Sequence, residues 1–435
     1  MTATLLRDAQ VITMAPNRPG VEQVDLLIDG DRIIDLGTDL NHPGAEIVDL
    51  PGRVIIPGLV NAHLHTWQTA LRCAGADWTL LGYLTRMHGA LAHRYRPEDM
   101  HIATLAGALG QIDSGTTTIG DWCHNCLTPD HADAAVDGLA ASGVRAVFMH
   151  GTPYRPPESG HPLEEIDRLL DNPACTNALI SLGMAAQGPQ LTAPEAAVAD
   201  FRAATERGLL ISMHQSGGAP EPGWEAVRAA GLFGPHTNIV HGIGLPEGWI
   251  KTLIDAGVSF TATAEVELTM GHGTPITGRL LHLGAAPSLG TDVESVAPGS
   301  MLTAARIALA HQRSLDHADH HAASGMLAAV PSVTARQALE WATVEGARAL
   351  GLADRVGRLA PGMQADLVAI DIRSLGLWPA HDPVAAAIYA DTADIEAVMI
   401  AGQWRKRAHS LLVDDVDALK DRLRESAAWL THEAD

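Results

Sequence analysis

The sequence predicts an α/β protein in which a (β/α)8 TIM barrel carries a small β-sandwich domain built from both chain ends. Three observations favour this fold class. Eight apolar runs of strand length occur along the middle of the 435-residue chain, and a helix-like segment follows each run. The run ends recur roughly every 30 residues, as parallel strands joined by helical crossovers require, and eight such units close a barrel. Short strand patterns also occur at both chain ends.

The two chain ends are expected to form the sandwich together. The first 57 residues contain short strand patterns, and Asp29 and Gly30 form a hairpin signal between two of them. Residues 363–372 and 395–407 have strand patterns again. The expected division is a composite sandwich from residues 1–57 and 361–410, the barrel from residues 58–360 and a C-terminal helix in 411–435.

The eight predicted barrel strands end at polar or small residues. They end near His65, Asp121, His150, Met184, His214, His241, Ala264 and Asp292. The first interval is about twice as long as the others, so we expect residues 66–100 to add a loop and a helix over the barrel mouth. Residues 301–351 have the spacing and composition of helices.

Composition and charge exclude several classes of function. The chain has 29 Lys and Arg against 51 Asp and Glu, a net charge of −22, and it therefore repels phosphate backbones and anionic lipid. We expect no nucleic-acid and no membrane partner. The start lacks a signal-peptide pattern, and we find no uninterrupted apolar run of about 18 residues. Four cysteines form no disulfide framework, so a cytoplasmic location is expected.

Five side chains at predicted strand ends indicate a metal site. His63 and His65 are two residues apart on the first strand, so both imidazoles face the same side. His214, His241 and Asp292 end three other strands. A lone histidine at a strand end is more often a hydrogen-bonded structural residue, but the joint placement at one rim favours metal ligation. Imidazole nitrogen and carboxylate oxygen suit Zn²⁺ or Fe²⁺.

Ordered motifs carry a family resemblance. The first strand and its flank, PGLVNAHLHTWQTALR, resemble the first-strand motif of the amidohydrolase superfamily, and SLGTD resembles its eighth-strand motif. The segment ATVEGARALGLADRVGRLAPGMQADLVAID is similar to that superfamily's passage from the last barrel helix back into the sandwich. More narrowly, the chain resembles the cytosine deaminase, guanine deaminase and triazine hydrolase branch.

The resemblance implies one metal ion. It assigns the metal ligands to His63, His65, His214 and Asp292, and a hydrogen bond to the metal-bound water or the substrate to His241. Binuclear relatives bridge two metals through a carboxylated lysine on the fourth strand, and the predicted fourth strand here contains no lysine. The expected cofactor is therefore one divalent ion, Zn²⁺ or Fe²⁺. It activates a water for attack on an electron-poor carbon, with Asp292 taking the proton.

One residue of the branch's pattern is missing. Close deaminases place a proton-shuttling glutamate three residues after the fifth-strand histidine, where this chain has Gly217. Two candidates could replace it, Glu267 and His272. Glu265 and Glu267 would share a face of an extended strand, so at least one carboxylate is expected to reach the rim. Alternatively, both carboxylates are buried in loop hydrogen bonds or exposed.

Candidate substrate contacts lie on three segments. Gln187 and Gln190 follow the fourth strand, where relatives have a proline-histidine, and two amides suit a lactam or heterocycle. Gln68 follows the first-strand histidines, and Trp78 could form part of a stacking wall together with Trp67 and Trp122. For each tryptophan, core packing is the alternative.

Cys123 and Cys126 form a CxxC pair, which could be mistaken for a redox or zinc site. A CxxC pair can be redox-active or bind zinc, but zinc needs two more ligands and the chain has no second cysteine pair. We expect both cysteines to line the pocket or to pack under a loop.

The sequence thus predicts a mononuclear metal-dependent hydrolase, an aminohydrolase acting on carbon–nitrogen bonds of a small heterocyclic substrate. The missing glutamate leaves non-deaminating alternatives open: an amide or lactam ring hydrolase, a dechlorinase or a decarboxylase-type lyase. A catalytically silent binding protein is a further alternative. A homo-oligomer, dimer or tetramer, is expected because oligomers are common among such relatives.

Overall fold

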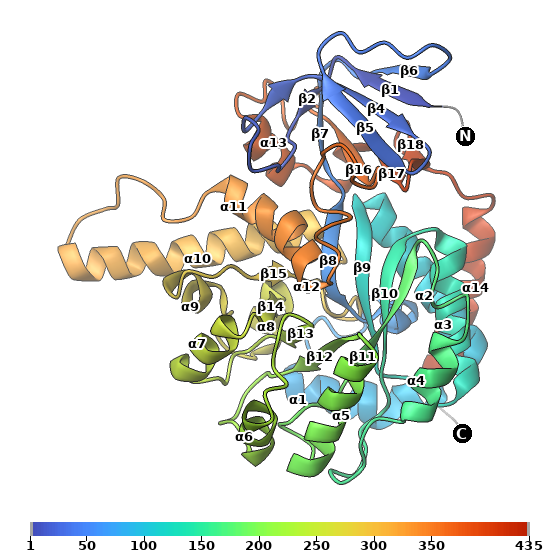
Figure 1. Ribbon diagram of the computed structural model, residues 1–435, viewed down its shortest axis with the longest axis vertical. Coiled ribbons are helices and arrows are strands. Elements are labelled where there is room, and N and C mark those ends of the chain that lie inside the picture. The colour runs from blue at the N-terminus through green and yellow to red at the C-terminus, as the bar shows by residue number, and fades with distance from the viewer. Residues whose placement is uncertain (1–2, 433–435) are drawn as a thin grey trace.

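The computed structural model describes residues 3–432. Residues 1–2, in the predicted N-terminal β region, and residues 433–435, at the end of the predicted C-terminal helix, lie outside the described residues. The chain forms a β-sandwich stacked on a larger α/β barrel (Figure 1). Strand β7 leads from the sandwich through Gly58 directly into the first barrel strand, so the sandwich lies where that strand begins.

The barrel consists of eight parallel strands that pair with their neighbours in chain order. They are β8 (Leu59–Leu64), β9 (Thr116–Cys123), β10 (Arg145–His150), β11 (Ile180–Ala185), β12 (Leu210–His214), β13 (Thr237–Val240), β14 (Ser259–Ala262) and β15 (Ser288–Leu289). The first and last strands are joined where the His65 amide donates to the Asp292 carbonyl (2.9 Å) and the Asp292 amide donates to the His63 carbonyl (3.0 Å). The predicted (β/α)8 barrel is confirmed.

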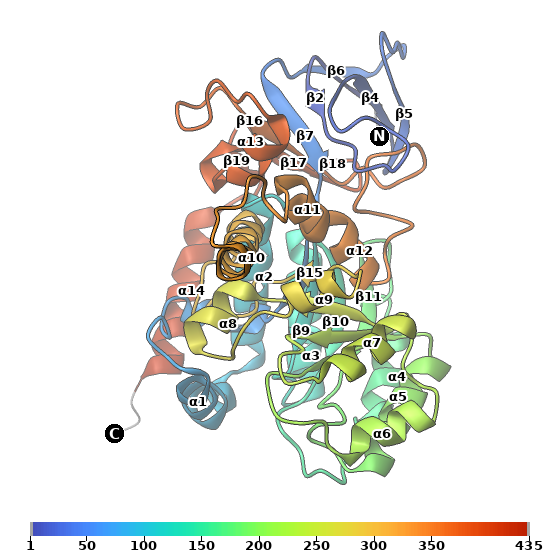
Figure 2. The ribbon, with the colours of Figure 1, turned by 90° about the vertical axis from the view of Figure 1, so that its left-hand side faces the viewer.

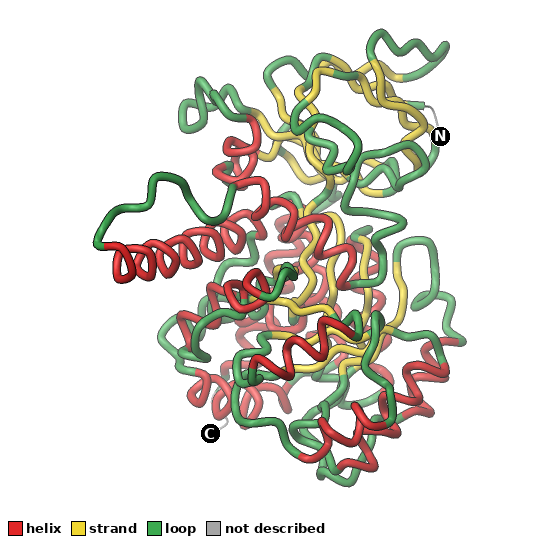
Figure 3. Tube along the Cα trace, turned by 60° about the vertical axis from the view of Figure 1, so that its left-hand side comes forward, coloured by secondary structure: helices red, strands yellow, loops and turns green. Residues whose placement is uncertain are grey.

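Helices surround these strands, which lie at the centre of the barrel in Figure 3. Every residue of β10 is buried, as expected for a parallel strand covered on both faces. Several helices begin with proline, whose fixed φ suits the first helical turn. The barrel helices are α2 (Pro97–Asp113), α3 (Pro129–Ser142), α4 (Leu163–Leu170), α5 (Pro194–Glu206), α6 (Pro222–Ala229), α7 (Glu247–Asp255), α8 (Ala264–Met270), α9 (Thr277–His282), α10 (Met301–Ser324), α11 (Ala335–Glu340), η4 (Trp341–Glu345) and α12 (Gly346–Ala349).

The sandwich contains two sheets built from both chain ends. One has the order β5-β4-β1-β6 and the other β19-β18-β17-β16-β7-β2-β3. The predicted hairpin at Asp29 and Gly30 joins β4 to β5, and Gly30 supplies the positive φ of 60° that the turn needs. The strands are β1 (Thr4–Arg7), β2 (Gln10–Val11), β3 (Glu22–Gln23), β4 (Asp25–Asp29), β5 (Arg32–Gly37), β6 (Glu46–Asp49), β7 (Arg53–Pro57), β16 (Leu367–Asp371), β17 (Ile395–Ile400), β18 (Gln403–Arg407) and β19 (Ser410–Leu411).

A helical insertion follows β8, as the long first interval predicts. It consists of η1 (Thr66–Leu71), α1 (Leu80–Tyr83), η2 (Leu84–Leu91) and η3 (Ala92–Arg94). The C-terminal helix α14 (Val416–Thr431) packs along α2, on the same flank as α1 (Figure 2). Helix α13 (Pro383–Tyr389) and the short η5 (Thr392–Asp394) lie between β16 and β17.

The segment after β14 corrects one prediction. Residues 264–270 form helix α8 rather than an extended strand, so Glu265 and Glu267 do not share a face. Two residues apart on a helix, their side chains diverge by about 200°. The composition AEVELTM favours a helix, and Gly271 ends it with a positive φ of 76°.

Within residues 3–432, no helix has both the length and the apolar character needed to cross a membrane.

Candidate metal centre and active site

Four donor side chains meet at the carboxyl ends of three barrel strands. His63 and His65 come from β8 and its end, His214 ends β12 and Asp292 follows β15. One ligand atom from each lies within 4.8 Å of all the others. The predicted convergence of these four residues is confirmed.

The distances show that the ring nitrogens aim at a common point. His214 Nε2 lies 3.1 Å from His63 Nε2, and Asp292 Oδ1 lies 3.5 Å from His63 Nε2 and 3.3 Å from His65 Nε2. Burial lowers the pKa of His63 to about 4 and that of His214 well below its usual value, so both rings are neutral and offer a lone pair. Three such nitrogens and a carboxylate fit one divalent cation.

Neighbouring groups fix the orientation of the ligands. His65 Nδ1 donates to the carbonyl of Trp122 at 2.6 Å, which leaves Nε2 free for a metal. Asp292 Oδ2 accepts a hydrogen bond from Thr263 Oγ at 3.1 Å. Burial alone would raise the pKa of Asp292, but the neighbouring imidazoles of His63, His65 and His241 hold that pKa well below its usual range. The carboxylate is therefore ionised.

His241 lies beside this cluster. Its Nδ1 is 2.9 Å from Glu267 Oε1, and its Nε2 is 3.8 Å from Asp292 Oδ2. Burial opposes protonation, but the hydrogen bond to Glu267 and the charge of Asp292 outweigh it and raise the pKa of His241. Both His241 and Asp292 have positive φ angles, 68° and 63°. Such backbone conformations are unfavourable for non-glycine residues and cluster at functional sites.

The two candidate shuttle residues differ in position. Glu267 is fully buried behind His241 and also accepts from the Thr263 amide at 3.0 Å. It does not line the pocket, so the expectation that its carboxylate reaches the rim is wrong. His272 does line the pocket, and its ring centroid lies 4.8 Å from that of His241. Burial and the neighbouring His241 lower the pKa of His272 to about 4.

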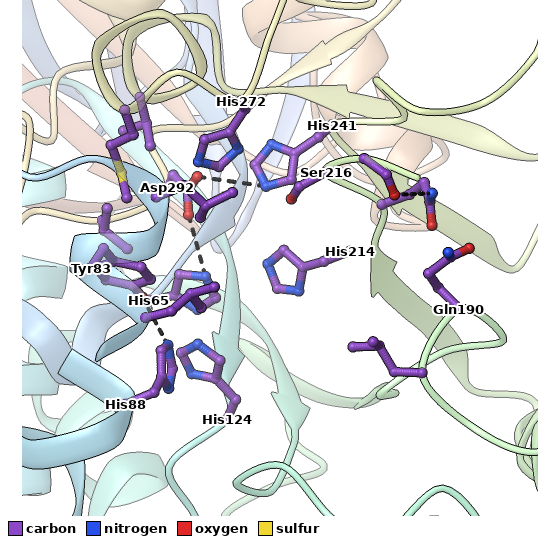
Figure 4. A pocket seen from close by; sticks show the side chains of 18 of the residues that line it. His65, Tyr83, His88, His124, Gln190, His214, Ser216, His241, His272 and Asp292 are labelled. Carbon is purple, nitrogen blue, oxygen red and sulfur yellow. Dashed lines mark hydrogen bonds and ion pairs between the residues drawn. The ribbon is translucent and has the colours of Figure 1, made fainter. Parts of the chain in front are cut away.

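A pocket of about 220 Å³ opens over the metal ligands (Figure 4). Among residues 3–432, no lysine or arginine lines it, and Asp292 is the one carboxylate that does. Gly217 belongs to the lining, and a Cβ atom placed there would meet no heavy atom within 4 Å. The position where close deaminases carry the shuttle glutamate is therefore open space.

Two predicted substrate contacts, Gln68 and Trp78, are absent from the pocket lining. Gln68 is fully buried, and its amide nitrogen donates to the Tyr83 hydroxyl at 2.6 Å. Trp78 is partly buried on the insertion, where the Arg86 guanidinium lies 5.5 Å from its ring. The prediction is wrong because η1 turns inward and carries Gln68 into the core.

Gln187 and Gln190, which follow the fourth barrel strand, form hydrogen bonds to neighbouring loops. Gln187 accepts from the Arg155 amide at 2.9 Å and donates to its carbonyl at 3.1 Å. Gln190 lines the pocket, but it accepts from Trp224 Nε1 (2.9 Å) and donates to the Ala219 carbonyl (3.0 Å). Each amide is therefore already engaged at both ends.

The sequence prediction missed two histidines in the pocket lining, His88 and His124. His124 lies between Cys123 and Cys126, which are buried in the core with their sulfur atoms 3.6 Å apart. The cysteines therefore pack under the loop, and the residue between them faces the pocket. His124 lies inside the CxxC motif, but that motif predicts nothing about the residue between the cysteines, and only the predicted insertion over the barrel mouth pointed toward His88.

Comparisons with known proteins agree with this geometry. A (β/α)8 barrel with these donors at its rim is typical of metal-dependent hydrolases, and the model of the amidohydrolase family matches residues 54–405. The chain belongs to the amidohydrolase family. It is 30% identical to a 5-methylthioadenosine/S-adenosylhomocysteine deaminase of Pelotomaculum thermopropionicum, over 99% of this chain and 100% of that protein. It is 28% identical to the 8-oxoguanine deaminase of Pseudomonas aeruginosa, over 93% and 94% of the two chains.

Solved structures share the fold. The zinc complex of the atrazine chlorohydrolase of Arthrobacter aurescens TC1 superimposes with a TM-score of 0.83 at 22% identity, covering 98% of this chain and 100% of that chain. A zinc-bound adenosine deaminase of Xanthomonas campestris gives 0.84 at 22% identity, covering 99% and 98%. The prediction of an amidohydrolase-family enzyme that acts on carbon–nitrogen bonds other than peptide bonds is confirmed.

Proposed function

We propose that this protein is a mononuclear, zinc-dependent aminohydrolase that removes an amino group from an uncharged nitrogen heterocycle. The observation that carries the proposal is the convergence of three imidazole nitrogens and one carboxylate oxygen within 4.8 Å at the pocket floor. Iron is the alternative metal, because the same ligands suit it. The deaminases among the relatives act on purine compounds, which supports a heterocyclic substrate.

The four converging side chains, His63, His65, His214 and Asp292, would hold the ion. When bound, such an ion supplies a water with a pKa lowered to about 7. Asp292 Oδ2, which points toward His241, is proposed to accept a proton, because the carboxylate is ionised and lies among the metal ligands. The Thr263 hydroxyl keeps that oxygen in place.

His241 is proposed to orient the attacking and leaving groups. Because Nδ1–H donates to Glu267, the ring presents Nε2 toward Asp292. Glu267 does not contact the pocket, so we assign it a positioning role. His272 is proposed to carry a proton to the leaving group, since it lines the pocket beside His241.

A second function follows from Gly217. Glycine carries no proton for a leaving amine, whereas chloride leaves without one. A dechlorinating hydrolase is therefore the second candidate, and the shared fold with an atrazine chlorohydrolase is consistent with it. Ammonia and chloride release from matched amino- and chloro-substituted heterocycles separates the two functions.

The test combines metal content with product analysis. Protein grown with zinc and iron available should contain about one equivalent of metal, and it should release ammonia from a panel of purines, pterins, pyrimidines and triazines. Less than about 0.2 equivalents of metal would favour the silent binding protein. Chloride release without any ammonia release would replace the first function with the second.

Two other expectations stay predictions. These are the homo-oligomer, dimer or tetramer, and the domain limits at residues 57/58, 360/361 and 410/411. Light scattering of the purified protein would test the first, and limited proteolysis would test the second.

A further inference from the structure

Two histidines with no part in the proposed chemistry form one wall of the pocket. His88 comes from η2 and His124 follows β9, and their ring centroids lie 4.4 Å apart at an interplanar angle of 75° (Figure 4). His124 also stacks on the metal-side ring of His65, with centroids 4.2 Å apart and planes 10° apart. We call His88 and His124 the donor pair. It borders the metal centre directly.

Hydrogen bonding locates the proton of His124. Its Nδ1 lies 2.9 Å from Trp67 Nε1. An indole nitrogen can only donate, so His124 Nδ1 must accept. An imidazole that accepts at one nitrogen is neutral and carries its single proton on the other. His124 therefore presents Nε2–H.

A longer chain of hydrogen bonds locates the proton of His88. The Ser295 hydroxyl donates to Gln68 Oε1 at 2.8 Å, and the amide nitrogen of Gln68 faces the insertion. Gln68 Nε2 then donates to the Tyr83 hydroxyl at 2.6 Å. Tyr83 has one proton of its own, and it donates that proton to His88 Nε2 at 3.1 Å. His88 is therefore neutral as well and presents Nδ1–H.

Both N–H groups lack an acceptor. Among residues 3–432, neither His124 Nε2 nor His88 Nδ1 has a hydrogen-bond partner, although both side chains line the pocket. Neither atom is among the buried side-chain atoms that lack both solvent contact and a hydrogen-bond partner, so both are accessible to a ligand. Donors left without an acceptor in a partly dry pocket cost free energy that a bound acceptor recovers.

The charge of the pocket restricts which acceptor fits. A carboxylate or phosphate ligand calls for a cationic side chain, and no lysine or arginine of the described part of the chain lines the pocket. Two neutral N–H donors on one pocket wall, from rings whose centroids lie 4.4 Å apart, match the two lone pairs of a carbonyl oxygen. Such an oxygen on a heterocycle belongs to a lactam.

We propose that the donor pair receives the carbonyl oxygen of an uncharged lactam heterocycle, with the reacting carbon of the same ligand turned toward the metal centre. The inference rests on the proposed function only in placing the reacting carbon of the ligand toward the metal centre. The sequence predicted that Gln187 and Gln190 would select a lactam, but their amides are engaged in loop hydrogen bonds. We assign that role to His88 and His124 instead.

The test compares the binding of two probes, hypoxanthine and purine, to the zinc-loaded protein by isothermal titration calorimetry. Hypoxanthine carries a lactam carbonyl and purine does not, and neither has an amino group to lose. His124→Phe keeps a flat ring against His65 but removes the N–H group, and His88→Phe removes the other donor. His93→Phe, at an exposed position on the same insertion, is the matched control.

Wild-type protein should bind hypoxanthine more tightly than purine. Each donor-pair variant should weaken hypoxanthine binding about tenfold, which corresponds to one lost hydrogen bond. Purine binding should stay within about twofold, the control should match wild type, and His124→Gln should partly restore hypoxanthine binding through its amide N–H. Equal losses for both probes, no loss for either, or no hypoxanthine binding to wild type at millimolar concentration would overturn the proposal.

The result separates the two proposals. Ammonia release with no carbonyl-dependent binding would keep the aminohydrolase and reject the donor pair. Carbonyl-dependent binding without ammonia release from any substrate would keep the donor pair and reject the aminohydrolase.

Discussion

The pocket has two walls of different origin. The metal wall consists of strand ends, with His63, His65 and His214 leaving β8 and β12 and Asp292 following β15. The adjacent wall is the donor pair, which comes from the helical insertion and from the turn after β9. The barrel strands therefore fix the positions of the metal ligands, whereas the helical insertion and the turn after β9 determine which side chains lie beside the metal centre.

The two walls also differ in what holds them. The metal wall is tied by backbone pairing between the first and last strands, including the amide of Asp292 on the carbonyl of His63. The donor pair is held by side-chain hydrogen bonds from Trp67 and Tyr83. Substitutions in the metal wall should therefore affect turnover, and substitutions in the donor pair should affect binding.

The largest expected effect comes from breaking the metal wall. His63→Ala removes one of three nitrogen ligands, so zinc content should fall below about 0.2 equivalents and turnover should drop on the order of 10³-fold or more. Metal analysis and steady-state kinetics on the same preparation measure both quantities. Asp371→Asn is the control, because Asp371 belongs to the other cluster of possible ligands, with Glu396 and His409. Full zinc retention in His63→Ala would contradict the assignment.

The next largest effect concerns the group behind the metal wall. Glu267→Gln removes the charge that supports His241, so we expect kcat to fall on the order of 10²-fold with little change in KM. Since Glu267 raises the pKa of His241, the pH profile of kcat should shift to lower pH in the variant. Glu265→Gln, on the other side of α8, should behave as wild type. An unchanged kcat in Glu267→Gln would remove the carboxylate from the mechanism.

Gly217→Glu adds, beside the metal wall, the carboxylate that close deaminases carry at this position. The open space at Gly217 accommodates a side chain. Ammonia release from an amino-substituted substrate should rise about tenfold, because a general acid then assists the leaving group. Gly217→Gln fills the same space without a transferable proton and should show no gain. A fall in both variants would show that the substrate itself occupies this space.

The smallest effect on activity is expected from the junction between the sandwich and the barrel. Arg145 Nε pairs with Asp366 Oδ2 at 2.7 Å, and both side chains are 1% exposed. Asp366→Asn leaves a buried guanidinium without its counterion, so the free energy of unfolding should fall by about 3–5 kcal/mol while kcat of the folded protein stays unchanged. Denaturant unfolding measures the loss. Arg373→Gln, where the arginine of the pair is half exposed, should cost far less, and a similar loss in both would contradict the distinction.

The metal wall could be predicted because its signal is periodic. A strand fixes the direction of each side chain, so the spacing of His63 and His65 places both rings on one face, and parallel strands bring His214 and Asp292 to the same rim. The structure confirms that convergence together with the barrel itself.

The other residues could not be predicted because their directions depend on local turns. Glu267 lies on a helix where an extended strand was expected, and η1 carries Gln68 inward to Tyr83. His88 lies on the short helix η2 and His124 on the turn after β9, and neither segment has a hydrophobic period that reveals which way the rings face. The directions of these side chains depend on tertiary packing, which the sequence pattern does not predict.

One metal ion is expected between the ends of β8, β12 and β15. Diffraction from crystals of the zinc-loaded protein on both sides of the zinc absorption edge would locate it. We expect one strong anomalous peak at about 2.0–2.2 Å from the Nε2 atoms of His63, His65 and His214 and from an Asp292 carboxylate oxygen. An active protein with no peak there, or with its only peak beside Asp371 and His409, would contradict it.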